Sequence, residues 1–68
     1  MEKFRQRIKE LREEHCLSKK QLAKELGVSD VAIGRWENGI RIPSVEILLV
    51  YAKYFKVSTD YIMGLEDW

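Results

Sequence analysis

Two adjacent residues have the side-chain types of a catalytic pair. His15 and Cys16 are the one histidine and the one cysteine of the 68-residue chain. A nucleophile and its general base work together only when their side chains face each other, and neighbours on a helix do not. One cysteine and one histidine are also too few ligands for a structural zinc site. These residue types therefore argue against an enzyme, and they imply no metal or other cofactor.

The basic side chains gather early in the chain. Residues 1–26 carry eight lysines and arginines against five acidic residues, a balance of +3, whereas residues 27–68 carry four against six, a balance of −2. The asymmetry is compatible with one face turned towards a polyanion such as nucleic acid. The alternative is a set of solvated helix surfaces of mixed charge.

Length and composition indicate one small soluble domain. Hydrophobic residues make up 46% of the chain and charged residues 34%, which is typical of a globular protein. The longest apolar run has six residues, 47–52, far below the roughly 18 of a membrane span. The charged start of the chain lacks the apolar stretch of a signal peptide. We expect a cytoplasmic protein with no membrane partner.

Four serines mark the starts of helices. Three follow an apolar residue and one follows Pro43, and each precedes an apolar residue by four positions: Leu17-Ser18 and Leu22, Val28-Ser29 and Ile33, Pro43-Ser44 and Leu48, Val57-Ser58 and Ile62. A serine at such a place accepts a hydrogen bond from a free backbone N–H of the first helical turn, and Gln21 completes a capping box with Ser18. Gly27, Gly39 and Gly64 follow the periodic segments as helix-ending residues do. The pattern predicts an all-α chain with helices over about 2–15, 18–26, 29–38, 44–55 and 58–63.

These helices must share one core. We expect a compact domain over residues 1–64 with a short tail over 65–68, and a core formed by Ile8, Leu11, Leu17, Leu22, Ala23, Leu26, Val28, Ile33, Val45, Leu48, Ala52, Phe55, Val57, Tyr61 and Ile62. Residues 18–38 combine a small residue where two axes would meet, Ala23, with a turn glycine, Gly27. This pattern predicts a helix-turn-helix over about 18–38. The alternative is a generic pair of antiparallel helices.

The segments LSKKQLAKELGVSDVAIGRWENGIRIP and SVEILLVYAKYFKVSTDYIMG resemble the Cro/C1-type (XRE-like) helix-turn-helix family, which includes the phage lambda-type repressors. The resemblance runs from about Ile8 to Gly64. It implies a five-helix, lambda-repressor-like DNA-binding domain of a transcriptional regulator, usually dimeric on a near-palindromic operator. Cys16 and Lys56 stand where the family often has a helix-ending glycine, so some strain is expected at these two connections.

The resemblance assigns base-reading to four residues of the helix 29–38, namely Asp30, Val31, Ala32 and Arg35. The chemistry is suitable, because arginine binds guanine O6 and N7, small apolar groups contact the thymine methyl, and a carboxylate accepts from cytosine N4. Three of these assignments have an alternative: Asp30 complements the helix dipole, Val31 packs on the preceding helix, and Arg35 binds a phosphate or pairs with Glu46.

Contacts to the DNA phosphate backbone are implied on both sides of that helix. The residues that would make them are Ser18, Lys19, Lys20, Asn38 and Arg41. Lys19 replaces a glutamine that in the family often touches both backbone and bases, and a lysine there favours a plain phosphate contact. Ser18 has the alternative role of a helix cap. The resemblance further implies an ion pair between Arg12 and Glu37, in which a bidentate arginine neutralises a carboxylate close to the DNA.

An apolar stripe at positions i, i+3 and i+7 of the helix 44–55 predicts a homodimer. The proposed interface consists of Ile47, Val50, Tyr54, Met63, Leu65 and Trp68. The alternative is that the C-terminal tail folds back over this stripe within one chain.

Together these features predict a sequence-specific regulator that binds double-stranded DNA and acts as a repressor, and they imply no small-molecule effector. It would work in the cytoplasm of a bacterium or a phage-infected host cell, associated with the nucleoid when bound. The alternative function is a protein–protein interaction module, of the antitoxin or anti-repressor-binding type, that uses the same stripe.

Overall fold

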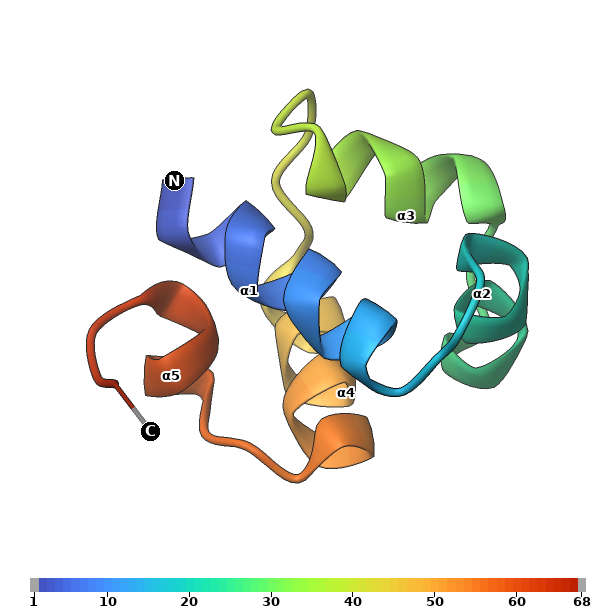
Figure 1. Cartoon of the computed structure of the whole chain (residues 1–68). Coiled ribbons are helices and arrows are strands. Elements are labelled where there is room, and N and C mark those ends of the chain that lie inside the picture. The colour runs from blue at the N-terminus through green and yellow to red at the C-terminus, as the bar shows by residue number, and fades with distance from the viewer. Residues whose placement is uncertain (1, 68) are drawn as a thin grey trace.

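Five α-helices make up the part of the chain that the computed structural model describes, residues 2–67. They are α1 (Glu2–Glu14), α2 (Lys19–Leu26), α3 (Asp30–Glu37), α4 (Val45–Phe55) and α5 (Thr59–Met63). No strand occurs between residues 2 and 67, and the all-α prediction is confirmed (Figure 1). Every helix begins and ends within one residue of its predicted range.

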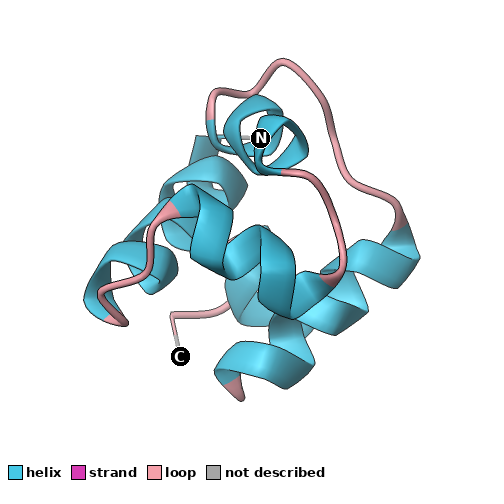
Figure 2. Ribbon diagram, turned by 90° about the vertical axis from the view of Figure 1, so that its right-hand side faces the viewer, coloured by secondary structure: helices cyan, strands magenta, loops and turns pink. Residues whose placement is uncertain are grey.

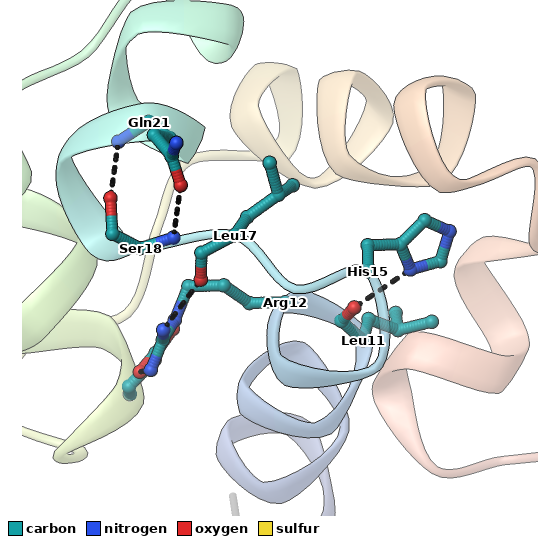
Figure 3. Close-up of polar contacts among 7 residues, drawn as sticks. Leu11, Arg12, His15, Leu17, Ser18 and Gln21 are labelled. Atoms are coloured by element: carbon teal, nitrogen blue, oxygen red, sulfur yellow. Dashed lines mark hydrogen bonds and ion pairs between the residues drawn. The ribbon is translucent and has the colours of Figure 1, made fainter.

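The serine caps explain where four helices begin. The hydroxyls of Ser18, Ser29, Ser44 and Ser58 each accept a hydrogen bond from the backbone N–H three residues later, at 3.0, 3.1, 3.3 and 3.0 Å. Each of these serines has an extended backbone, as an N-cap requires. Gln21 Oε1 accepts in return from the N–H of Ser18 at 2.8 Å, so the predicted capping box is present (Figure 3).

Two helices end on residues with left-handed backbone that are not glycine. Cys16 has φ 56° just after α1, and Lys56 has φ 57° as the C-cap of α4. A side chain in this conformation crowds the following carbonyl, which costs about 1–2 kcal/mol. The strain expected at these two connections is therefore present in the backbone.

The core unites all five helices. Its buried apolar side chains are Phe4, Ile8, Leu11, Leu22, Ala23, Leu26, Ile33, Trp36, Tyr51, Phe55 and Ile62. Three aromatic rings pack in a row inside it. Trp36 meets Tyr51 edge-on with ring centroids 6.1 Å apart, and Tyr51 stacks on Phe55 with ring centroids 6.1 Å apart. Six further predicted residues, Leu17, Val28, Leu48, Ala52, Val57 and Tyr61, are partly buried and pack against this cluster.

The predicted core is wrong at Val45, which is 72% exposed. Val45 is the first residue of α4. The buried residues of that helix are Tyr51 and Phe55, and Val45 does not lie on the same face as they do. Tyr51, absent from the prediction, has no exposed surface. Phe4 and Trp36 were also absent from the predicted core and are buried.

The arrangement of the helices leaves α3 along one edge of the molecule. Figure 1 shows α3 beside α2 on that edge, with α4 and α5 on the other side of α1. The connection between α3 and α4, residues 38–44, is the longest of the four and arches from the end of α3 to the start of α4 (Figure 2). This arrangement exposes one long side of α3 together with the start of α2.

Candidate nucleic-acid interface

The unit formed by α2 and α3 is held by a tight turn. Gly27 ends α2 with φ 73°, and the N–H of Val28 donates to the carbonyl of Ala23 at 3.0 Å. Ala23 is buried, with 4% of its surface exposed, and its small side chain lets the two helices pack closely. Ser29 then caps α3. The geometry is that of a helix-turn-helix, as predicted.

α3 has a buried side and an outward side. Ile33, Trp36 and Glu37 point inward, with exposed fractions of 0%, 9% and 6%. Asp30, Val31 and Arg35 are exposed, Val31 at 57%. Three of the four residues predicted to read bases therefore share the outward side. Ala32 differs, because it is half-buried and packs against the core.

The alternative roles of these residues can be compared with their surroundings. Val31 is too exposed to serve as packing between α2 and α3. Within residues 2–67 no ion pair joins Arg35 to Glu46, although both are exposed. Asp30 lies in the first turn of α3, where a carboxylate also complements the helix dipole. The side chains of Val31 and Arg35 are thus available for an external partner.

The five residues predicted to contact phosphate flank this surface. Ser18, Lys19 and Lys20 lie at the start of α2, and Asn38 and Arg41 lie just after α3. All five are exposed. The Ser18 hydroxyl already accepts the capping hydrogen bond from Gln21. Arg35 and Arg41 line the same surface pocket, together with Ile42.

Arg12 and Glu37 fasten this unit to α1. Arg12 Nε donates to Glu37 Oε2 at 2.7 Å, and Arg12 Nη2 donates to Glu37 Oε1 at 3.0 Å. The third donor, Arg12 Nη1, reaches the carbonyl of Leu17 at 2.9 Å (Figure 3). The side chains are 11% and 3% exposed. The hydrogen bond to Glu37 raises the pKa of Arg12 against the opposing effect of burial. The pair fixes the end of α3 against α1 and the α1–α2 connection.

Tyr51 is a buried polar group that the sequence did not single out. Its hydroxyl has no hydrogen-bond partner within residues 2–67. Burial raises the pKa of Tyr51, the charge of Glu37 raises it further, and the charge of Arg12 lowers it. The phenol therefore stays protonated in the folded protein at neutral pH. A tyrosine inside an apolar run looks like any other core residue, so no sequence signal marks this hydroxyl.

The C-terminal segment lies against α1. Arg7 Nη1 donates to the carbonyls of Tyr61 and Glu66, and its guanidinium carbon lies 4.3 Å from the centre of the Tyr61 ring. Arg7 Nη2 is also 3.5 Å from Asp67 Oδ1. Arginine and backbone carbonyls thus hold residues 61–67 in place on α1.

The apolar surface of α4 differs from the predicted stripe. Ile47 is half-buried against the core, and Val50 and Tyr54 are each 37% exposed. Val45 and Leu49, outside the stripe, are more exposed at 72% and 53%. Of the three C-terminal residues in the prediction, Met63 is half-buried, Leu65 is 74% exposed, and Trp68 lies outside the described residues. α4 thus exposes apolar side chains, but the two most exposed, Val45 and Leu49, are not part of the predicted stripe.

His15 and Cys16 have separate surroundings. His15 Nδ1 lies 2.8 Å from the carbonyl oxygen of Leu11 (Figure 3). The His15 ring packs edge-on against Phe55, with ring centroids 4.9 Å apart. Cys16 is exposed. Within residues 2–67 no three histidine, cysteine or acidic side chains gather as metal ligands. None of the helices in this range has the length and apolar character needed to cross a membrane.

Comparison with known proteins decides the family. The family model described as helix-turn-helix matches residues 8–62. The chain belongs to the Cro/C1-type helix-turn-helix family. This family and this fold are those of DNA-binding transcriptional regulators rather than of enzymes. Recognition of the family from the sequence is therefore confirmed.

Three curated relatives share this helix-turn-helix region. The uncharacterized HTH-type transcriptional regulator YobD of Bacillus subtilis is 37% identical over 62 residues, which are 91% of this chain and 55% of that protein. The HTH-type transcriptional activator BcrR of Enterococcus faecalis is 36% identical over 94% of this chain and 31% of its own length. The HTH-type transcriptional regulator ImmR of B. subtilis is 30% identical over 90% of this chain and 48% of its own length. The chain thus spans about half or less of each relative.

Solved structures with the same helix-turn-helix fold include the P22 c2 repressor. Its complex with the synthetic operator 9T superposes with a TM-score of 0.83 at 34% identity, covering 91% of this chain and 94% of that one. The DNA-binding domain of the same repressor in solution gives a TM-score of 0.81 at 35% identity, covering 88% and 79%. The similarity extends over nearly the whole fold and confirms the predicted fold class.

Proposed function

We propose that this chain binds double-stranded DNA sequence-specifically and regulates transcription, as a repressor that occupies an operator and excludes polymerase. The observation that supports this most is the outward side of α3, where Arg35 and Val31 project from a helix whose other side is locked into the core. The P22 c2 repressor, similar over 91% of this chain, is described in complex with an operator. We carry that partner class over to this chain.

In this proposal α3 lies in the major groove, which is wide enough to admit a helix. Arg35 binds the O6 and N7 acceptors of a guanine, Val31 contacts a thymine methyl, and Asp30 accepts from cytosine N4. Ala32 plays a smaller part, because half of its surface is used in packing. The Arg12–Glu37 pair holds α3 in one orientation, so the base-reading side chains of α3 are already positioned before DNA binds.

Contacts to phosphate position the protein without reading sequence. Lys20 lies near the free N–H groups at the start of α2, and Asn38 and Arg41 lie beyond the other end of α3. Ser18 can donate its hydroxyl proton to a phosphate while its oxygen keeps the cap. These groups would span two sides of one groove and produce a binding constant that falls steeply with salt.

A second copy of the chain is the proposed partner of the apolar surface on α4. The exposed apolar side chains of α4 are Val45, Leu49, Val50 and Tyr54. A two-fold dimer would present two copies of α3 about 34 Å apart, which matches half-sites one helical turn apart. Leu49→Glu should weaken self-association in sedimentation experiments without DNA. Ile40→Glu, at an apolar residue 70% exposed in the loop after α3, is the control. Equal association of both variants and the wild type would contradict this dimer.

The DNA proposal is tested with a duplex selected from random sequence. Arg35→Ala should cost about 1–3 kcal/mol of binding free energy on that duplex and lose its preference at one base pair. Lys53→Ala, an exposed lysine on α4, should leave that preference intact and serves as the control. If wild type selects no sequence and its binding has no salt dependence, the proposal is wrong.

The alternative function is a protein–protein interaction module, of the antitoxin or anti-repressor-binding type. The exposed apolar surface of α4 favours it, since such patches often mark protein contacts. The two functions differ in one measurement. A chain that acts only through α4 would lose its partner in Leu49→Glu and would bind duplex DNA without sequence preference.

A further inference from the structure

Gly34 is a glycine that the fold does not require. It occupies the fifth position of α3 and has ordinary helical backbone, unlike Gly27, Gly39 and Gly64 with their positive φ. A Cβ at this place would meet one neighbouring atom within 4 Å, Lys19 Nζ at 3.8 Å, which is ordinary van der Waals contact. Alanine would fit there and is a much better helix former. Packing and turn geometry therefore give no reason for the glycine.

The atom above Gly34 is an ammonium group from another helix. Lys19 is the first residue of α2, and its side chain extends across to α3 so that Nζ lies over Gly34. Within residues 2–67 this ammonium forms no ion pair. Lys19 thus places a positive charge over α3, and no acidic group of residues 2–67 forms an ion pair with it.

Gly34 is half-buried and borders the outward side of α3. It follows the exposed Val31 by three positions, and residues three apart are neighbours on a helix surface. The ammonium of Lys19 therefore lies beside the residues proposed to read bases. Because Gly34 has no Cβ, no side chain projects from α3 at this position, and a base edge can approach the ammonium closely.

We infer that Lys19 reads a guanine in the major groove through the gap left by the missing side chain of Gly34. The inference rests on the proposed DNA binding and changes the expected role of Lys19 from a phosphate contact to a specificity contact. A lysine ammonium has three donors and no acceptor, and the guanine edge offers two acceptors, O6 and N7. Cytosine presents a donor there and would repel it.

The inference predicts the composition of the half-site. Arg35 and Lys19 are both pure donors on one face of α3, so each requires an acceptor edge. The half-site should therefore contain two separate guanines. Arg35→Ala should lose the preference for one of them, and Lys19→Ala should lose the preference for the other.

The experiment compares sequence preference in three proteins. Wild type, Lys19→Ala and Gly34→Ala each select duplexes from the same random pool, and binding to single-base variants of the wild-type site is then titrated. Lys19→Ala should lose about 5- to 150-fold of discrimination at one guanine. Gly34→Ala should lose preference at the same base pair, because its methyl group occupies the gap between Lys19 and the base. Circular dichroism melts establish that both variants remain folded.

Lys20→Ala is the matched control, since Lys20 is the neighbouring exposed lysine of the same helix. It should weaken binding to every duplex by the same factor and lower the salt slope by about one per bound copy. If Lys19→Ala behaves like Lys20→Ala, Lys19 is a phosphate contact and the inference is wrong, while the proposed function stands. If the wild type itself selects no sequence, the proposed function fails and the inference fails with it.

Discussion

Single residues set the stability of the region that carries α3. The buried hydroxyl of Tyr51 feels the charges of both Arg12 and Glu37, and it has no hydrogen-bond partner within residues 2–67. Arg12 in turn uses three nitrogens on Glu37 and on the carbonyl of Leu17. A few polar atoms in an otherwise apolar interior therefore control how firmly α3 is held.

Tyr51 should make the protein sensitive to alkaline pH. Its pKa is raised above the ordinary 10.0 in the folded state, chiefly by burial, so the unfolded chain releases the proton first. Below about pH 10 this group leaves the free energy of unfolding unchanged. Above that pH the free energy should fall by about 1.4 kcal/mol per pH unit. Urea unfolding of Tyr51→Phe should lack this part of the decline, and equal slopes in both proteins would contradict the account.

Removing one partner of the buried ion pair should be severe. Arg12→Ala leaves Glu37, whose side chain is 3% exposed, without a counter-charge, at a cost of about 3–5 kcal/mol. A chain of this size has roughly 3–10 kcal/mol in total, so much of the protein would unfold. The control is Arg5→Ala, whose pair with Glu2 is exposed and should contribute about 0–1 kcal/mol. Similar melting temperatures for the two variants would show that the Arg12 pair is not structural.

The helices illustrate which features a sequence reveals. Serine caps act through hydrogen bonds to the next three residues, so Ser18, Ser29, Ser44 and Ser58 could be placed from local sequence. The inward side of α4 could not be placed from local sequence. Residues 47–52 are all apolar, so their pattern does not decide which helix face is buried. That ambiguity led to the wrong placement of Val45 and the omission of Tyr51.

The outward side of α3 was also predictable in part. The resemblance to the family assigns base-reading to Asp30, Val31 and Arg35, and all three are exposed. Ala32 is half-buried because of packing that depends on the neighbouring helices. The approach of Lys19 to Gly34 depends on how α2 crosses α3, which is set by side chains from both helices and is not encoded by spacing along the chain.

At the scale of the helix, Lys56 offers a test of the strained helix end. Its φ of 57° is unfavourable for a side chain, whereas glycine adopts it freely. Lys56→Gly should raise the free energy of unfolding by up to about 1 kcal/mol, less than the strain itself because glycine also gains freedom in the unfolded chain. Lys53→Gly, inside the same helix, should lower it by about 1 kcal/mol. Opposite signs in chemical denaturation are expected, and two losses would contradict the strain argument.

The molecule as a whole separates two surfaces. It measures 28 × 23 × 20 Å, and Figure 1 shows α3 on one side with α4 and α5 on another. The proposed DNA contacts use α3 and the start of α2, while the proposed contact with a second copy uses α4. Both surfaces can therefore be occupied together. The net charge of +1 does not reveal this, because the charges that matter are local to the α2–α3 side.

The central claim is that Arg35 projects from α3 onto a guanine edge in the major groove, and methylation interference tests it most directly. Methylation of guanine N7 removes the acceptor that Arg35 needs. On the selected duplex, wild type should be excluded by methylation at specific guanines, and Arg35→Ala should become indifferent to methylation at one of them. Absence of interference in the wild type, or an unchanged pattern in Arg35→Ala, would contradict the account.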